Sequence, residues 1–237
     1  MTGGARASGD EVREMFGRIA PRYDRLNHVL SFNIDRYWRA RTADLLESIL
    51  RRPGARVLDL CCGSGDLLLA LEARGGAGLL GGDFCHPMLV EAARKLAREH
   101  SRSSLFEADA LSLPLADRSL DLVTLGFGFR NLTDYRAGLA EIRRVLKAGG
   151  TAAILEFSTP PNAAFRAFYR FYSRRLLPRI GAVLSGSREA YEYLPDSVER
   201  FPDAATLAGE MQRAGFTGVR FYRMTLGVVA LHLGRAS

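Results

Sequence analysis

Short apolar runs alternate with amphipathic stretches through the middle of the chain. Apolar runs of about four to eight residues between turn-forming residues are typical of buried strands, and apolar residues at every third or fourth position are typical of helices. The pattern predicts strands at 56–61, 79–84, 104–108, 120–126 and 152–157 and helices at 66–74, 87–100 and 134–146. The last of these helices should end before Gly149-Gly150. Strands alternating with helices predict a parallel sheet with helices on both faces.

The segments on either side of this alternating core have patterns of their own. Residues 11–51 have helical periodicity, with breaks expected at Pro21 and Asn33. The later segments are a basic, aromatic helical insert, then a helix and a closing antiparallel pair of strands: 162–194, 204–214, 216–224 and 228–233. We therefore expect one α/β domain over 1–237, with a Rossmann-like, mostly parallel sheet of seven strands.

The segment 57–67, VLDLCCGSGDL, places a Gly-x-Gly turn after a predicted buried strand and before a predicted helix. Gly63 and Gly65 leave the backbone free of Cβ atoms where a ligand can approach. In open α/β sheets ligands bind outside the carboxyl ends of the strands, where this turn should lie. Asp83 ends the next predicted strand, at the position where an acidic side chain meets ribose hydroxyls. These features predict a nucleoside-containing cofactor at the turn and Asp83.

The residues around the turn distinguish between two classes of cofactor. A dinucleotide-binding turn has a third glycine where this chain has Leu68, and its pyrophosphate favours a neutral or basic loop. Here Asp59 and Asp66 flank the glycines. S-adenosylmethionine has no phosphate, and its sulfonium and ammonium groups are cations that nearby carboxylates favour. The sequence thus favours an S-adenosylmethionine-dependent methyltransferase over an NAD-binding protein, with Asp59 and 63–65 at the cofactor.

Two further strand ends complete the predicted cofactor site. Asp109 and Ala110 follow the third strand, where they could hold the adenine edge; a turn or helix cap is an equally good interpretation of the pair. Gly126 ends the fourth strand beside the place where the methyl group would leave. Cys61 and Cys62 are interpreted as small strand-end residues rather than nucleophiles, because methyl transfer needs no covalent enzyme intermediate.

Composition sets limits on the function. The formal net charge is +7 and the pI about 9.7, and nearly all the positive charge is arginine, since Lys95 and Lys147 are the only lysines. Such basicity suits nucleic acid or an anionic membrane surface. The three cysteines lack CxxC spacing, so we expect neither a disulfide framework nor a metal site. With no apolar core of a signal peptide and no membrane-spanning run, a cytoplasmic protein is expected.

Several strings of residues between about Met15 and Gly234 carry a more specific signal. They are Phe16, Tyr23-Asp24, Asn27, Ser31-Phe32 and Trp38; Leu58-Asp59-Leu60 with Gly63-Ser64-Gly65-Asp66; Gly128 to Asn131; Arg144 to Lys147; Leu155 to Ser158; Tyr191 to Leu194; and Gly227 to His232. With them the chain resembles the C-methyltransferases of quinone biosynthesis, which methylate demethylmenaquinol and, in some organisms, 2-polyprenyl-6-methoxy-1,4-benzoquinol. General methyltransferases share the glycine loop but not the Phe-Arg-Asn string or the N-terminal one.

The resemblance implies which residues contact S-adenosylmethionine. In the family these are the hydroxyl residue of the glycine loop, the acid that ends the second strand and the pair after the third strand, here Ser64, Asp83, and Asp109 with Ala110. Many members have threonine in place of Ser64, which keeps the hydroxyl. Many also have a serine where this chain has Gly126, so only the backbone can serve there.

The resemblance also implies a polyprenyl quinol substrate and thereby a chemical problem. A quinol carbon becomes a good nucleophile when a ring hydroxyl loses its proton, and phenols titrate near about pH 10. An arginine beside that oxygen favours the phenolate without acting as a base. We therefore expect Arg130 to stabilise the phenolate and Asn131 to fix the ring. The deprotonating base stays open among four candidates: His232, Tyr23, Asp24 and Glu156.

The segment 162–188 contains six arginines and no acid. Aromatic residues recur at helical spacing on one face, and Arg166, Arg170 and Arg174 recur on another. One interpretation is a lid helix whose aromatic residues pack on the core. The other is an interfacial helix whose arginines meet an anionic membrane, from which a long-tailed quinol would be drawn. Both can hold together.

Two alternative functions stay open from the sequence. One is methylation of another small aromatic substrate. The other is an RNA methyltransferase, which the high pI favours. The chain has no recognisable RNA-binding appendage, so we expect no nucleic-acid partner. The sequence assigns no oligomeric state.

Overall fold

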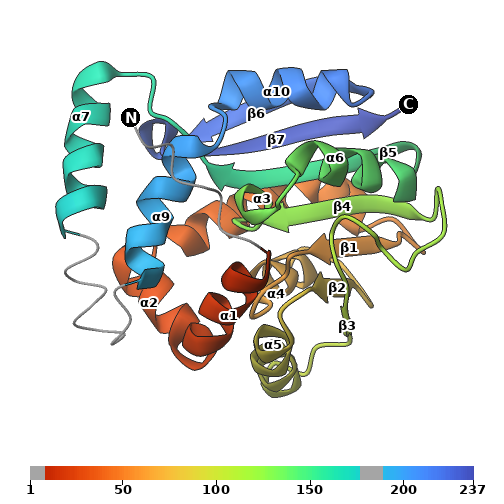
Figure 1. Ribbon diagram of the computed structural model, residues 1–237. Coiled ribbons are helices and arrows are strands. Elements are labelled where there is room, and N and C mark those ends of the chain that lie inside the picture. Colours follow the sequence, from red (N-terminus) through yellow and green to blue (C-terminus); the bar gives the residue numbers. More distant parts are fainter. Residues whose placement is uncertain (1–8, 177–188) are drawn as a thin grey trace.

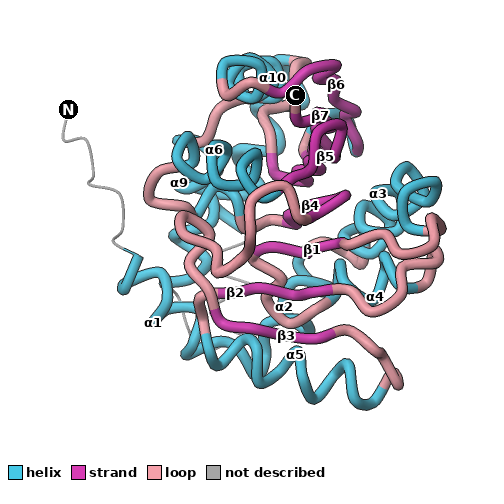
Figure 2. The backbone as a smooth tube through the Cα atoms, turned by 90° about the vertical axis from the view of Figure 1, so that its right-hand side faces the viewer, coloured by secondary structure: helices cyan, strands magenta, loops and turns pink. Residues whose placement is uncertain are grey.

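The computed structural model describes residues 9–176 and 189–237, and its strands form one sheet (Figure 1). Figure 2 shows their order across the sheet, β3-β2-β1-β4-β5-β7-β6. The strands are β1 Val57–Leu60, β2 Leu80–Asp83, β3 Ser104–Glu107, β4 Leu120–Gly126, β5 Leu146–Phe157, β6 Phe216–Met224 and β7 Val229–Ala236. Pairs from β3 to β5 are parallel, and β7 is antiparallel to both β5 and β6. The predicted fold class is confirmed.

The direction in which strands are added reverses beside β1. The chain first adds β2 and β3 on one side of β1, and then returns to add β4 on the other. All four residues of β1 are buried, as expected for a central parallel strand with both faces covered. Such a reversal opens a crevice at the carboxyl ends of the strands, which is the usual ligand site in this architecture.

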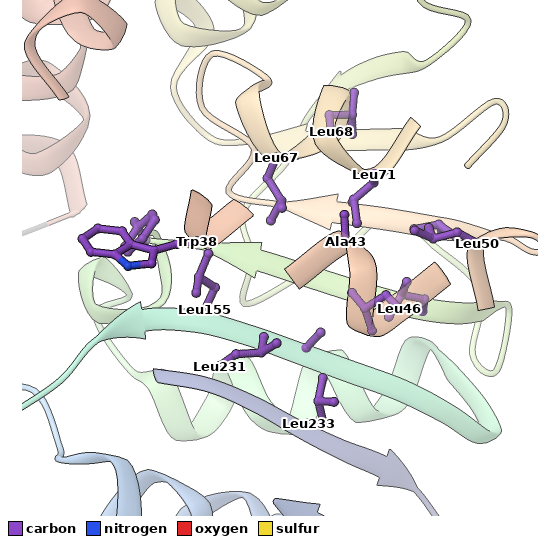
Figure 3. Packing of buried hydrophobic residues seen from close by; sticks show 14 of the residues in the cluster. Trp38, Ala43, Leu46, Leu50, Leu67, Leu68, Leu71, Leu155, Leu231 and Leu233 are labelled. Carbon is purple, nitrogen blue, oxygen red and sulfur yellow. The ribbon is translucent and has the colours of Figure 1, made fainter. Parts of the chain in front are cut away.

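Helices cover both faces of the sheet. One face carries α3 Ile34–Leu50, α4 Asp66–Glu72 and α5 His86–Arg98, and the other carries α6 Tyr135–Val145 and α10 Ala204–Arg213. Figure 3 shows part of the first core, with Leu46 of α3, Leu71 of α4 and Leu231 of β7 among its buried side chains. These side chains are at most 1% exposed, and full burial of each contributes about 1.5–3 kcal/mol.

The N-terminal segment folds as three helices around two breaks. They are α1 Gly9–Ile19, α2 Tyr23–Leu30 and α3, with a 3₁₀ turn at Ala20–Arg22 between the first two. Pro21 lies within that turn, and Asn33 takes a left-handed φ of 60° immediately before α3. Both predicted breaks are confirmed. Phe16 of α1 and Tyr23 of α2 line the crevice, so this segment covers the site at the carboxyl ends of the strands.

The basic, aromatic insert is not one helix. It begins as α7 Ala163–Phe171, continues as a π-helical turn at Tyr172–Leu176, and the chain later forms α9 Glu189–Arg200. Arg179 and Arg188, counted among its six arginines, lie outside the described residues. Among the described residues no helix is both long and apolar enough to cross a bilayer.

The structure corrects two predicted boundaries. Helix α6 ends at Val145, and β5 begins at Leu146 rather than at 152. Leu146 pairs with Leu120 of β4, and pairing resumes at Thr151 opposite Leu122, so the residues between form a bulge that contains Gly149-Gly150. The two glycines therefore serve a bulge inside a strand and do not stop the helix. Strand β7 also runs beyond the predicted end at 233, because it pairs with β6 to Ala236.

Candidate functional site

Most of the predicted site residues surround one cavity at the carboxyl ends of β1, β2 and β4. The cavity encloses about 1030 Å³ of space not filled by atoms, its open mouth included. This space suits a small molecule the size of a cofactor. The predicted residues that line it are Asp59, Gly63, Ser64, Asp83, Asp109, Ala110, Gly126 and Asn131. Three predicted residues do not: Gly65, Arg130 and His232.

The glycine turn has the backbone that its sequence predicts. Gly63 has a φ of 55° and Gly65 a φ of 87°, both in the left-handed region that glycine tolerates. Gly65 precedes α4, and a Cβ there would lie 3.6 Å from the Cβ of Ala92 on α5. Gly65 therefore serves the turn and the packing of two helices. Cys61 and Phe127, which line the cavity, are also left-handed, so unusual backbone clusters at this site.

Asp83 holds the turn in place through its carboxylate. One oxygen accepts a hydrogen bond from the backbone N–H of Gly63 at 2.8 Å, and the other accepts one from Cys85 at 2.9 Å. Asp83 is only 6% exposed, and this burial raises the pKa of the carboxyl, against the lowering effect of the N–H donors. The carboxylate thus lies at the predicted position, beside the cavity and bonded to the turn.

Asp59 is buried at the base of the cavity with half of its carboxylate unsatisfied. Its Oδ1 accepts a hydrogen bond from Thr124 Oγ1 of β4 at 2.7 Å. Its Oδ2 is buried and has no hydrogen-bond partner among the described residues. Burial raises the pKa of Asp59 to about 7. A buried acceptor without a partner is costly, so the site fits a ligand that brings a cation or a donor to this oxygen.

Asp109 and Ala110 after β3 and Gly126 at the end of β4 also line the cavity. The Asp109 carboxylate accepts a hydrogen bond from the Leu111 N–H at 2.9 Å, so one of its oxygens already stabilises its own loop. Ala110 is buried and lines the cavity beside it. A Cβ on Gly126 would lie 3.0 Å from Leu67 Cδ2, so a side chain there would require the Leu67 side chain of α4 to shift slightly. The glycine thus keeps this wall free of side-chain atoms.

Ser64 is part of a chain of polar contacts that ties α2 to the glycine turn. Its hydroxyl donates to the Asp24 carboxylate, and Lys95 of α5 pairs with both Asp24 and Asp66 at 2.5 Å. The N-terminal segment is thus held on the cavity by charge-assisted contacts as well as by packing. A cofactor contact of the Ser64 hydroxyl, implied by the family resemblance, would have to share or replace its bond to Asp24.

His28, Asp35 and Asp66 place potential ligand atoms within 4.8 Å of one another, as a metal site would. Cations of the chain already occupy this cluster. Arg39 pairs with Asp35 and lies 3.7 Å from Asp66, which Lys95 also contacts. The cluster is therefore accounted for as an ion-pair network beside the cavity, and the expected absence of a metal stays a prediction.

Arg130 is buried behind the cavity wall, where three protein groups bind its guanidinium. Its Nη1 donates to Glu156 Oε1 at 2.9 Å and to the Phe127 carbonyl, and its Nε donates to Ser197 Oγ of α9 at 3.2 Å. The side chain is 5% exposed and that of Glu156 1%, so the two form a buried ion pair. The sequence predicted a guanidinium directed at a substrate oxygen; the structure instead directs it at its own chain.

Asn131 follows Arg130 and lines both the main cavity and a smaller one between α9 and the segment 130–133. Its side-chain oxygen accepts a hydrogen bond from the Tyr193 hydroxyl of α9 at 3.1 Å. Asn131 is thus the member of the Phe-Arg-Asn string that reaches the cavity. Arg130 bonds to the Phe127 carbonyl before it and to Ser197 of α9, so its contacts hold the segment that carries Asn131.

Of the four candidate bases, Tyr23 alone lines the main cavity. Burial raises the pKa of its hydroxyl, so Tyr23 is a neutral hydrogen-bond donor at pH 7. Asp24 is bound to Ser64 and Lys95, and Glu156 to Arg130. His232 is buried against α10, where its Nε2 lies 2.9 Å from the Ala204 carbonyl, and burial lowers its pKa. Its place two strands from the cavity does not support the tentative catalytic role.

The cysteines at the end of β1 do not supply a nucleophile. Burial raises the pKa of the Cys61 and Cys62 thiols well above the ordinary range, with nearby carboxylates adding to the effect. Both therefore stay protonated, and a thiol is a weak nucleophile.

Several residues of the cavity wall were not predicted from the sequence. They come from the N-terminal helices, α5 and the loop after β4: Gly9, Phe16, Arg39, Met88, Leu132 and Thr133. Arg39 carries a signal in the sequence, because it occupies a buried position of α3 next to Trp38, where a charge needs a partner. The others are small or apolar, and only the fold shows which of them meet the ligand.

Comparisons with known proteins agree with this geometry. A model of the ubiE/COQ5 methyltransferase family matches residues 5–236. A demethylmenaquinone methyltransferase of Thermus thermophilus is 48% identical over 221 residues, which cover 93% of this chain and 99% of that protein. One of Deinococcus radiodurans is 45% identical, covering 95% of this chain and 92% of that protein.

Solved structures show the same fold at low sequence identity. A methyltransferase of Thermotoga maritima superposes with a TM-score of 0.65 at 16% identity, covering 94% of this chain and 99% of that one. One of Aquifex aeolicus gives 0.60 at 17% identity, covering 83% of this chain and 89% of that one. The resemblance drawn from the separate strings of residues is therefore confirmed, and the chain belongs to the ubiE/COQ5 methyltransferase family.

Proposed function

We propose that this enzyme transfers the methyl group of S-adenosylmethionine to a ring carbon of demethylmenaquinol, giving menaquinol. The observation that carries the proposal is the cavity at the strand ends, where the unsatisfied carboxylate oxygen of Asp59 lies beside an open glycine turn. Family membership over 5–236 and the names of the relatives support the substrate. Relatives at 41–44% identity are named for both ubiquinone and menaquinone biosynthesis, so the benzoquinol step is a second candidate.

The cavity wall fits the parts of S-adenosylmethionine. The anionic oxygen of Asp59 suits its cationic end, Asp83 its ribose hydroxyls, and Asp109 with the Ala110 amide its adenine edge. When bound, this co-substrate supplies an electrophilic methyl group. The walls at Gly63 and Gly126 let the backbone come close to it, because neither residue has a Cβ.

On the substrate side, we propose that Tyr23 and Asn131 hold the quinol ring. The neutral Tyr23 hydroxyl can donate a hydrogen bond to a quinol oxygen, which favours the phenolate over the phenol. Asn131 fixes the ring in the plane needed for in-line attack, a positioning effect that can supply several kcal/mol. Arg130 is a positioning residue, because the Glu156 carboxylate already neutralises its charge and its bonds hold Asn131 in place.

We further propose that the whole chain, 1–237, acts as one methyltransferase domain at the cytoplasmic face of the membrane that holds its polyprenyl quinol. No metal and no nucleic acid are part of the proposal. The lipid substrate supports the location, since a long isoprenoid tail keeps the quinol in the bilayer.

The proposal is tested by supplying purified protein with S-adenosylmethionine and a short-tailed demethylmenaquinol. We expect a product heavier by one methyl group on the ring by mass spectrometry, and accumulation of demethylmenaquinone in a deletion strain. Methylation of the benzoquinol precursor alone would transfer the function to the second candidate. If RNA or another small aromatic compound accepts the methyl group and neither quinol does, the proposal is wrong.

Asp59 gives a prediction with opposite effects on stability and binding. Its folded pKa of about 7 exceeds the ordinary 3.8, so the stability contributed by the protonated form is full below about pH 4 and lost as the pH rises through 7. Asp59→Asn should therefore raise the melting temperature without cofactor by at least about 2 °C at pH 8, and by less at pH 5.

The same substitution removes the anion proposed to meet the cofactor. Calorimetry at pH 8 should show S-adenosylmethionine binding at least about tenfold more weakly, the loss of one hydrogen bond to a charged group. An unchanged affinity together with the gain in melting temperature would show that Asp59 does not face the ligand.

A further inference from the structure

The exposed surface of α7 carries large aromatic side chains as well as arginine. Phe165 and Tyr169 pack against the core, while Phe168 and Phe171 are 65% and 58% exposed. The aromatic residues that the sequence placed on one face are thus divided between two. Figure 1 shows α7 standing at the edge of the molecule, away from the sheet.

The arginines of this helix are turned toward their own chain. Arg166 donates to the Pro160 carbonyl at 3.1 Å, and Arg170 and Arg174 both pair with Glu199 of α9. Glu199 offsets part of the charge of Arg170 and Arg174, and the Pro160 carbonyl holds Arg166 against its own chain. A membrane contact made by Arg170 and Arg174 would have to share or replace their bonds to Glu199.

Two other large apolar side chains project from strained turns. Phe32 is 72% exposed and Leu226 70%, more than any other large apolar residue that the structure describes. Phe32 has a φ of 53° and Leu226 a φ of 55°, a left-handed backbone that bulky residues rarely adopt and that costs of order 1–3 kcal/mol. The left-handed backbone and the exposure of an apolar side chain to water each lower the stability of the folded protein. Their occurrence together points to a function for both turns.

Contacts bring these turns to α7. The Phe32 ring lies 6.4 Å from that of Tyr172, which directly follows α7. On the other side, a Cβ on Gly227 would lie 2.7 Å from Pro161 Cδ, so the turn with Leu226 packs on the loop leading into α7. We call Phe32, Phe168, Phe171 and Leu226 the apolar rim.

We propose that the apolar rim inserts into a lipid bilayer and seats the enzyme on the membrane that holds its quinol. This inference rests on the proposed function, which requires access to a substrate with a polyprenyl tail. Arg36 follows Phe32 by four residues and Arg175 follows Phe171 by four; both are exposed, and no ion pair of either occurs within the described part of the chain. Exposed aromatic residues flanked by exposed arginines match the boundary between acyl chains and anionic head groups.

The size of the rim favours a bilayer over a second copy of the chain. Large apolar side chains present roughly 150–250 Å² each, so four that are about two-thirds exposed offer roughly 500 Å². A stable protein interface needs about 800 Å² from each partner. A fluid bilayer needs no complementary surface and accepts separate projecting side chains.

Vesicle binding by two matched variants tests the proposal. In the rim variant, Phe168→Ser and Phe171→Ser remove exposed rings, and Phe32→Gly and Leu226→Gly also relieve the left-handed strain. In the arginine variant, Arg166, Arg170 and Arg174 become glutamine. Both are measured, with the parent chain, on phosphatidylcholine vesicles with and without phosphatidylglycerol at about 0.1 and 0.5 M salt.

We expect the rim variant to melt no lower than the parent and to bind both kinds of vesicle at least 100-fold more weakly. The arginine variant should bind within about threefold of the parent, and binding by the parent should persist in high salt, because screening acts on charges and not on burial. Turnover of a short-tailed, water-soluble quinol should be unchanged in the rim variant, and turnover of a long-tailed quinol in vesicles should fall.

Other outcomes overturn the inference. Equal binding by the rim variant and the parent excludes insertion through the rim. A salt-sensitive loss confined to the arginine variant transfers the contact to the arginines, each contributing about 1 kcal/mol near an anionic surface. A parent that binds no vesicles but forms a dimer that the rim variant loses assigns the rim to a second copy. If the parent fails to methylate even the short-tailed quinol, the proposed function is what has failed.

Discussion

Replacing Asp83 by alanine is expected to weaken S-adenosylmethionine binding at least about tenfold. The carboxylate is proposed to accept hydrogen bonds from the ribose hydroxyls, and a hydrogen bond to a charged group contributes about 1.5–3 kcal/mol. In the absence of ligand it also holds the Gly63 N–H at 2.8 Å, so its loss should loosen the turn on which the cofactor rests. The lost ribose hydrogen bonds and the loosened turn both weaken S-adenosylmethionine binding, and calorimetry measures their combined effect on the affinity.

A neighbouring carboxylate provides the control for Asp83. Glu107 ends the adjacent strand β3, lies outside the main cavity, and pairs with Arg13 and His86 at the surface. Glu107→Gln should leave S-adenosylmethionine affinity within about twofold of the parent. If Asp83→Ala also binds normally and melts normally, the ribose does not lie at the end of β2.

The cofactor half of the site could be predicted because its chemistry is local in sequence. The turn at 63–65 needs glycines where the backbone is left-handed, and Asp59 and Asp83 lie in the last two residues of strands that the sheet places side by side. Strand ends next to one another in a parallel sheet bring their side chains to one edge. A short stretch of sequence therefore contains both the residues that shape the cofactor turn and the carboxylates that surround it.

The substrate side of the site depends on ion pairs between residues far apart in the chain, which spacing in the sequence does not reveal. Arg130 and Arg170 look alike as arginines near aromatic residues, yet one pairs with Glu156 in the core and the other with Glu199 on α9. The pairing of β5 with β4 brings Glu156 to Arg130, and the position of α9 beside the end of α7 brings Glu199 to Arg170. For the same reason the sequence could not show that Arg166 and Arg170 bond to their own chain while Phe168 and Phe171 are exposed.

The bulge in β5 is a second case in which context overrides a local signal. Gly149-Gly150 indicates a helix stop, and it directly follows a predicted helix. In the structure a Cβ on Gly150 would lie 2.8 Å from the Lys147 carbonyl, because the bulge brings the backbone of these two residues close together. The glycines are required, but by a bulge, and the pairing of Leu146 with β4 decides between the two.

Arg130→Lys is expected to lower turnover of a short-tailed quinol by about 10- to 100-fold while S-adenosylmethionine affinity stays within about threefold. The guanidinium binds Glu156, the Phe127 carbonyl and Ser197 at once, and so joins the end of β4 to β5 and α9. A lysine keeps the charge but not the planar fork, so at least one of these buried groups loses its partner. One such loss is about 1.5–3 kcal/mol, and it falls on the segment that carries Asn131.

The matched control is Arg136→Lys, which changes an exposed arginine bound through two nitrogens to Glu210, away from the cavity. It should leave turnover unchanged, because neither residue lines the cavity and Glu210 keeps Arg213 as a second partner. A fall in kcat for Arg130→Lys without a change in cofactor affinity identifies a positioning role on the substrate side. Retained turnover would show that Arg130 has no such role. A parallel loss of cofactor affinity would show that Arg130 acts on the cofactor pocket, because it binds the carbonyl of Phe127, which lines the cavity.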